Sequence, residues 1–365
     1  MDVVGPSRPS VRSADVMHRE RLTAQLLSGP RPDHVEPAVA HLLAVQAQDP
    51  RGLRLAVRSR TTGTSVADVD AALTDRRSLV VSWLNRGTLH LVAAEDYWWL
   101  HPLTTPQLAT GNATRLRQEG VSPKQADRGV AVIYEQASAH GPRTRGELRD
   151  ALDAEGVPTA GQALVHLLVA ASLRGDLIRG PVRGKEQCFV SAAQWLGEPA
   201  KPVDRLDALA RLARRYLVGH GPASERDLAR WAGITIGDAR RGLAEVTDEV
   251  EVRPDGLVDL ADRQDPAPLP LPRLLGPFDP VLCGWSSRDF IVDGHTGLVT
   301  NNGLFRPFAL VGGRAVATWG LDGGRITIRL LEAIKAPDLR KLQVDASDVW
   351  RFLGLAKKEV VVVEG

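Results

Sequence analysis

An internal repeat constrains the fold of this chain more than any other feature. Residues 139–148 read AHGPRTRGEL and residues 219–228 read GHGPASERDL, so one pattern recurs after 80 residues. A hydroxyl residue followed three positions later by an acid forms a capping box, which satisfies free backbone N–H groups where a helix begins. Both copies contain this spacing, in the pairs Thr144 with Glu147 and Ser224 with Asp227. The repeat therefore predicts one structural unit that occurs at least twice.

The residues around each copy predict the same succession of elements. An amphipathic helix precedes the copy, and a glycine marks its end. A second glycine-marked turn opens a third helix, and two strands with alternating hydrophobicity then form a hairpin. The first helices span 126–139 and 204–218, and the hairpins span 177–190 and 250–260. Three helices followed by a β-hairpin make a winged-helix unit.

The N-terminal part fits the same plan with an insertion. We expect helices at 13–27 and 33–47, a third helix that begins at Ser65, and a hairpin at 79–92 with its turn at residues 85–87. A long loop, 49–64, separates the second and third helices, and loops on a rigid scaffold often carry function. The prediction is three tandem winged-helix units, at 1–124, 125–200 and 201–264.

The character of the sequence changes at about Asp265. Residues 265–280 hold six prolines and are typical of a linker. Short apolar runs punctuated by glycines follow and predict strands; they are FIVDG, TGLVT, FALVGGRAVATWG and RITIRLLEA. A helix at about 337–353 leads into a last strand, VVVVE. The expected fold class is α+β, with a C-terminal domain at 265–365 built on a small antiparallel β-sheet or barrel.

Composition limits the class of protein. No run of 18 apolar residues occurs and the N-terminus lacks the apolar core of a signal peptide, so we expect a cytoplasmic protein without a membrane span. The two cysteines, Cys188 and Cys283, are too few for a disulfide scaffold, and no His-Glu-x-x-His spacing points to a metal. We therefore expect neither a metal nor a cofactor. The sequence has no long heptad repeat of the kind that forms a coiled-coil dimer, so a monomer is expected.

A glutamine interrupts an apolar pattern, and a second glutamine lies two positions further on. The predicted helix at 33–47 carries an apolar stripe that would continue onto Gln46. Pro50 disfavours helix at Asp49, so the chain should straighten here, and residues two apart in an extended segment face the same way. Gln46 and Gln48 would then project together, with Asp49 alongside. Taken alone, the pair could equally cap a helix end or line a loop.

Three motifs together resemble one family. VQAQDP at 45–50, SWLNRGTLHLV at 82–92 and LLGPFDP at 274–280 are similar, in the same order, to motifs of bacterial winged-helix DNA glycosylases of the AlkZ-like type. The YcaQ-like enzymes are a more distant branch, with Gln-x-Asp in place of Gln-x-Gln. The resemblance covers roughly residues 14–350. It implies that Gln46 and Gln48 are catalytic. It also implies a double-stranded DNA substrate with an alkylated or crosslinked guanine or adenine, including bulky N7 adducts and interstrand crosslinks.

Neutral catalytic residues suit this chemistry. Alkylation at N7 places a positive charge on the purine, which is then already a good leaving group. The enzyme must mainly position water and stabilise an oxocarbenium-like sugar, and an amide can both donate and accept hydrogen bonds. Asp49 could add negative charge, although a role in fixing the loop is favoured. Because no lysine precedes Lys124, a Schiff-base intermediate and a lyase activity are not expected.

Arginines in the insertion and at the hairpin tip are the candidate DNA contacts. The guanidinium fork matches a phosphate group. Arg86 lies at the predicted turn and His90 beside it, although His90 could equally be a hydrogen-bonded structural residue. The insertion contributes Arg51, Arg54, Arg58 and Arg60, of which Arg54 and Arg58 could share a helical face.

Two other functions remain open from the sequence. A winged-helix transcription regulator without catalysis is the main alternative, and a docking protein on DNA is another. Against a regulator, the third helix of the second unit, TAGQALVHLLVAASL, is apolar nearly all round and cannot read the major groove. Release of an N7-alkylated base would separate the enzyme from both alternatives.

Overall fold

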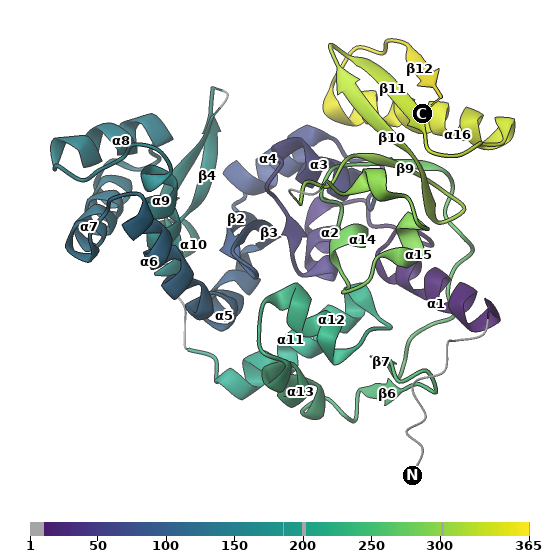
Figure 1. Ribbon diagram of the computed structural model, residues 1–365, viewed down its shortest axis with the longest axis horizontal. Coiled ribbons are helices and arrows are strands. Elements are labelled where there is room, and N and C mark those ends of the chain that lie inside the picture. The colour runs from purple at the N-terminus through teal and green to yellow at the C-terminus, as the bar shows by residue number, and fades with distance from the viewer. Residues whose placement is uncertain (1–10, 185, 199–201, 301–302, 365) are drawn as a thin grey trace.

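The computed structural model describes residues 11–184, 186–198, 202–300 and 303–364 and has an α+β fold. Figure 1 shows the second unit on one side of the molecule, the third unit below its centre and the C-terminal sheet with its long helix at the top. Among the described residues, no helix combines the length and the apolar character needed to cross a membrane. Residues 1–10 and Lys185, which belong to the predicted first unit and second hairpin, lie outside the described residues.

The first winged-helix unit has the predicted elements. Ser65 and Asp68 form the capping box at the start of α4, and the hairpin turns at residues 85–87. The helices and strands of this unit are α1 (Val11–Ala24), α2 (Val35–Leu42), α4 (Val66–Thr74), β2 (Leu79–Leu84) and β3 (Thr88–Ala93). Three further helices lead to the second unit: α5 (Ala94–Thr104), η1 (Pro106–Leu108) and α6 (Ala109–Gln118).

The second and third units confirm the repeat. Both predicted capping boxes form, with Thr144 and Ser224 at the N-caps. The second unit contains α7 (Pro123–His140), α8 (Arg145–Ala154), α9 (Ala163–Leu173), β4 (Leu177–Arg183), β5 (Glu186–Ser191) and α10 (Ala192–Leu196). The third contains α11 (Arg205–His220), α12 (Glu225–Ala232), α13 (Ile236–Ala244), β6 (Val250–Val252) and β7 (Val258–Leu260). The boundaries at 124, 200 and 264 stay predictions.

The prediction that the second helix reaches residue 47 was wrong. Helix α2 ends at Leu42 because Leu43 has a φ of 64°, a left-handed conformation that breaks the helical hydrogen-bond pattern. The chain then forms β1 (Val45–Gln46), in which Val45 pairs with Leu91 and Gln46 with His90. The resulting sheet has the order β1-β3-β2-β4-β5, so the wings of the first two units lie in one sheet.

The insertion is also different from its prediction. Residues 49–64 were expected to form a loop, but they contain α3 (Pro50–Arg58). Asp49 is its N-cap and Pro50 its first helical residue, where the missing N–H of proline costs nothing. Leu53, Ala56 and Val57 face a core that also contains α2 and α4 side chains.

The C-terminal domain is an open sheet rather than a barrel. Among the described residues its strand order is β12-β11-β10-β9-β8, and β12 is parallel to β11 while the other pairs are antiparallel. Helix α16 (Ala336–Leu353) packs on this sheet through a core that includes Trp350 and Leu274. The strands are β8 (Arg273–Leu275), β9 (Phe308–Val311), β10 (Arg314–Asp322), β11 (Arg325–Leu330) and β12 (Val360–Val363).

Three details of this domain correct the expectations from sequence. FIVDG forms one turn of helix, α15 (Asp289–Val292), and TGLVT contains η2 (Thr296–Leu298). Apolar runs this short fit a helical turn as well as a strand, so their pattern does not distinguish the two kinds of secondary structure. The linker also contains structure, namely β8 and α14 (Pro280–Cys283). One core joins Leu84 of the first unit, Tyr216 of the third and Phe308 of the sheet.

Candidate active site and DNA interface

Gln46 and Gln48 lie side by side, as the extended-segment argument predicts. Gln46 Nε2 donates a hydrogen bond to Gln48 Oε1 over 2.5 Å. Gln46 is only 7% exposed, while Gln48 is exposed. The backbone between them is held by β3, since the N–H of Ala47 donates to the Leu89 carbonyl over 2.7 Å. The pair therefore joins a fixed, buried amide to one that solvent can reach.

The hydrogen bond between the two amides leaves an acceptor oxygen free on Gln46 and a donor nitrogen free on Gln48. In the described part of the chain, Gln46 Oε1 and Gln48 Nε2 make no further side-chain hydrogen bond. An amide that donates through its nitrogen becomes a better acceptor at its oxygen, because hydrogen bonds in a chain polarise one another. Gln46 thus presents a strengthened acceptor, and Gln48 presents a strengthened donor.

His90 lies behind Gln46 and cannot serve as a cation for DNA. It occupies the β3 position paired with Gln46 and is 2% exposed. Burial, the largest cause, and the nearby Arg86 together lower the pKa of His90 to about 3. The ring is neutral at pH 7 and bonds to the Thr88 carbonyl through Nδ1 at 2.9 Å. The prediction of a DNA contact is corrected to the structural role that was its alternative.

Asp49 caps a helix. Its Oδ1 accepts a hydrogen bond from the N–H of Gly52 over 2.6 Å and so fixes the first turn of α3. Gly52 is required here because a Cβ would lie 2.6 Å from the Pro277 carbonyl oxygen. The turn that follows Gln48 is therefore clamped between its own cap and the 274–280 segment.

The LLGPFDP segment supports the glutamine pair through a buried ion pair. Asp279 accepts two hydrogen bonds from Arg60, at 2.7 and 2.9 Å, and both side chains are fully buried. Arg60 also donates to Gln25 Oε1, and Asp279 caps α14 through the N–H of Val281. Helix α14 lies against β1. The prediction that Arg60 contacts DNA is wrong, because these partners enclose its guanidinium group.

Arg58 is likewise a structural residue. It is 3% exposed and bonds to Asp345 and Asp348 of α16 and to the Leu274 carbonyl of β8. The expected DNA contact through Arg58 is therefore corrected, since the guanidinium is enclosed by two carboxylates. No local pattern could show this, because all three partners lie more than 200 positions away.

The other two arginines of α3 remain nearer the surface. Arg54 does not share a partner with Arg58: it pairs with Asp70 of α4 and donates to the Pro50 carbonyl. Arg51 is exposed and donates to the Leu321 carbonyl over 3.2 Å. It also borders a hollow of about 450 Å³ that begins at Asp49 and is walled by Pro277 and Trp319. Of the predicted contacts on α3, Arg51 is the most accessible.

Arg86 links the hairpin tip to the third unit. Its Nη1 donates to the Arg230 carbonyl over 3.2 Å. Burial lowers the pKa of Arg86, and the neighbouring cations Arg230 and Arg288 lower it further. Three cations therefore gather near the tip of the hairpin that carries His90.

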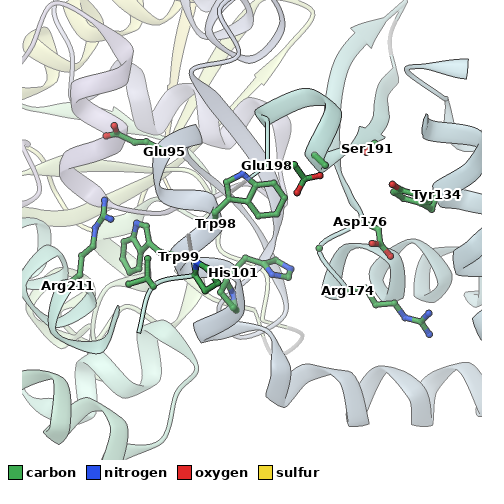
Figure 2. A pocket seen from close by; sticks show the side chains of 15 residues that line it. Glu95, Trp98, Trp99, His101, Tyr134, Arg174, Asp176, Ser191, Glu198 and Arg211 are labelled. Atoms are coloured by element: carbon green, nitrogen blue, oxygen red, sulfur yellow. The ribbon is translucent and has the colours of Figure 1, made fainter. Parts of the chain in front are cut away.

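A separate cavity of about 660 Å³ lies between α5 and the second unit (Figure 2). Its walls include Trp98, Tyr134, Asp176 and Glu198, and none of the predicted site residues lines it. For the part of the chain that is described, no group of three or more His, Cys, Asp or Glu side chains could hold a metal ion.

Comparison with known proteins agrees with the motifs. A family model described as "DNA glycosylase AlkZ-like" matches residues 39–352. An "Interstrand DNA cross-link repair glycosylase" from Streptomyces sahachiroi is 26% identical and is aligned over 94% of this chain and 97% of its own. The solved structure of "Streptomyces sahachiroi DNA glycosylase AlkZ" has the same fold, with a TM-score of 0.79, 23% identity and coverage of 96% of this chain and 99% of that one. With its fold, its motifs and most of its length in agreement, the chain belongs to the AlkZ-like DNA glycosylase family.

Proposed function

We propose that this DNA glycosylase is monofunctional and hydrolyses the N-glycosidic bond of bulky N7-alkylated purines in double-stranded DNA, including purines in interstrand crosslinks. The hydrogen-bonded Gln46–Gln48 pair carries the proposal, because among the described residues it joins a buried amide with a free acceptor to an exposed amide with a free donor. The name of the Streptomyces sahachiroi relative, a cross-link repair glycosylase, supports the proposal that the substrates include interstrand crosslinks. Family membership favours a glycosylase over the transcription regulator that the sequence left open.

The proposed reaction breaks one bond and forms one. The bond between the sugar C1′ and the cationic base breaks, the electron pair leaves with the base, and the alkylated base departs neutral. A water oxygen bonds to C1′ and its proton passes to solvent. Gln46 Oε1 accepts a hydrogen bond from this water, and the carbonyl dipoles stabilise the developing sugar cation. Gln48 Nε2 donates to an oxygen of the sugar or the phosphate.

A lyase step is not part of the proposal. A Schiff base needs an amine near C1′, and the sequence has no lysine before Lys124. Gln46 and Gln48 have no nucleophilic amine, because an amide nitrogen is not basic. The expected product is therefore an abasic site in an intact strand.

We propose Arg51 and Arg86 as the DNA contacts nearest to this pair. Arg51 lies on the first turn of α3, which follows Gln48, and Arg86 lies on the hairpin that pairs with β1. A DNA phosphate bound by the guanidinium of Arg51 or of Arg86 would hold the duplex close to the two glutamines. We further propose a monomer that acts in the cytoplasm, with domain boundaries at 124, 200 and 264.

A single-turnover assay tests the function. The protein is incubated with a duplex that contains one N7-alkylguanine, and the released base and the strand are analysed separately. We expect free base and an intact strand that breaks only on later heating in alkali. A matched reaction with borohydride should trap no protein–DNA adduct. Failure to release any base from N7-methyl, bulky N7 or crosslinked duplexes would overturn the proposal.

A further inference from the structure

A groove at the far end of α3 has the character of an anion site. It has a volume of about 330 Å³ and lies between the loop 61–63, the start of β8 and α16. Arg31, Arg273, Lys341 and Arg351 line it, together with Asp345 and Asp348. Helix α3 has nine residues and so a length of about 13 Å, which separates this groove from the glutamine pair at its other end.

The two carboxylates of the groove are already engaged. Asp345 accepts from both terminal nitrogens of Arg58, at 2.9 and 3.2 Å, and from the N–H of Leu274 at 2.7 Å. Asp348 accepts from Arg58 at 3.0 Å and pairs with Arg351 at 2.7 Å. The negative charge of both residues is therefore directed at Arg58 and Arg351.

Arg31 and Arg273 have no such partner. Among the described residues, Arg31 makes no side-chain hydrogen bond or ion pair, although it is half-buried. Arg273 donates one hydrogen bond, from Nη1 to the Ser59 carbonyl over 2.6 Å, while its buried Nε has no acceptor among the residues that the structure describes. Lys341 is compensated by Asp338 at 3.5 Å. Two guanidinium groups thus face one groove without an ion-pair partner of their own among the described residues. Asp345 and Asp348, which act on them at longer range, are shared with Arg58 and Arg351.

Burial makes this arrangement costly unless an anion occupies the groove. Burial, the largest cause, and the cation Arg31 together lower the pKa of Arg273 to about 10, against an opposing effect of Asp345. Burial also lowers the pKa of Arg31, with Arg58 the next cause, while Asp348 and Asp345 act in the opposite direction. Both groups remain charged at pH 7, and a partly buried charge without a partner is unfavourable until an anion supplies the missing hydrogen bonds.

We propose that this groove binds a phosphate group through Arg31 and Arg273. The planar fork of arginine matches the oxygens of a phosphate, and several donors from two side chains can hold one group. The source could be the backbone of bound DNA or a free phosphate, which have the same chemistry at the binding oxygens. The proposal does not depend on catalysis by the glutamine pair.

Thermal melts with inorganic phosphate test the site. Wild-type protein is melted in increasing phosphate against sodium chloride of equal ionic strength and pH. A ligand that binds only the folded state raises the melting temperature in proportion to its occupancy. We expect phosphate to stabilise the wild type, and Arg31→Ala to weaken the apparent phosphate affinity by about tenfold or more. Arg31→Lys should retain part of the effect, because it keeps the charge but loses the fork.

Arg31 is the informative position because its side chain makes no hydrogen bond within the described part of the chain that its removal could break. Arg31→Ala should therefore melt at or above the wild-type temperature in chloride. Arg149→Ala is the matched control: it removes an exposed arginine of α8 with the same change of net charge, and it should leave the phosphate effect intact. Equal stabilisation of the wild type and Arg31→Ala by phosphate would overturn the proposal.

A DNA-binding measurement identifies the source of the phosphate. The affinity for an undamaged duplex is measured as a function of salt. If the groove holds a DNA phosphate, Arg31→Ala reduces the log–log salt slope by about 0.9, the value for one lost contact. If the slope and affinity are unchanged while the phosphate effect in the melts is lost, the ligand is a free phosphate.

Discussion

Arg60 and Asp279 are separated by 219 positions in the chain and form a fully buried ion pair with two hydrogen bonds. The pair fastens the chain just beyond α3 to the loop that starts α14, and α14 lies against β1, the strand that contains Gln46. The position of the candidate catalytic strand thus depends on a contact distant from it in sequence.

Asp279→Asn should destabilise the protein strongly. The substitution keeps the size of the side chain but leaves the buried Arg60 guanidinium without its counter-charge, and breaking a buried pair in this way typically costs about 3–5 kcal/mol. Urea unfolding at pH 7 measures the change. Asp150→Asn, on the exposed surface of α8, is the matched control and should change the free energy of unfolding by less than about 0.5 kcal/mol. A loss for Asp279→Asn as small as that of the control would contradict the structural role.

Gln46→Ala and Gln48→Ala should each retain the fold and DNA binding but lose base release. Removal of one hydrogen bond to a transition state typically costs on the order of 10²–10³ in rate. Because the two amides are bonded to each other, the double variant should be less impaired than the product of the single effects. Single-turnover release of N7-methylguanine gives the rates, and thermal melts check folding. Wild-type rates in both single variants would place the active site elsewhere.

Gln48→Asp is the sharper companion to these alanine variants. It copies the Gln-x-Asp motif of the YcaQ-like branch and keeps an oxygen that can accept from Gln46. Its added charge can stabilise a sugar cation, so we expect release of the small cationic N7-methylguanine to exceed that of Gln48→Ala.

Arg51→Ala should weaken DNA binding without lowering stability, and Arg58→Ala should lower the stability of the fold. Arg51 is exposed, so its loss should reduce the log–log salt slope of duplex binding by about 0.9 with little effect on unfolding. Arg58 is enclosed by Asp345 and Asp348, so Arg58→Ala should lower the free energy of unfolding by several kcal/mol. Fluorescence anisotropy at several salt concentrations and urea titrations provide the two quantities. The opposite pattern would return Arg58 to the DNA interface.

The buried His90 should make stability fall in acid. Its pKa is lowered to about 3 in the folded protein, whereas an unfolded histidine titrates near 6.5. Between these values the unfolded chain binds a proton that the folded chain does not, so stability is lost as the pH falls below about 6.5. His90→Gln should reduce the slope of the free energy of unfolding against pH, measured between pH 4.5 and 6, by the amount that corresponds to about one proton taken up on unfolding. His140→Gln, at an exposed histidine, should leave a steeper slope than His90→Gln.

Local signals were enough to predict much of the fold. The capping boxes at Thr144, Ser224 and Ser65 act within four residues, and each marks a helix start in the structure. Asp49-Pro50 is a start signal of the same kind for helix α3, but a proline equally marks the end of a preceding helix, so the sequence alone leaves this signal ambiguous.

The site was less predictable, because its environment is assembled from distant segments. The period-two argument placed Gln46 and Gln48 together, which the structure shows. No local pattern distinguishes the exposed Arg51 from Arg58 and Arg60, whose carboxylate partners lie on α16 and at the start of α14. The assignment of a cation to DNA or to the interior therefore required the tertiary structure.

The shared sheet of the first two units has a mechanical consequence. The wings meet where β2 pairs with β4, at Val81 and Arg179, and β2 is joined through β3 to the strand that contains Gln46. Any swing of the second unit towards a duplex must either carry the glutamines with it or rupture the pairing at this seam. The wing of the second unit and the glutamine strand are therefore connected through one continuous hydrogen-bonded sheet, so their relative position is tied to the pairing of Val81 with Arg179.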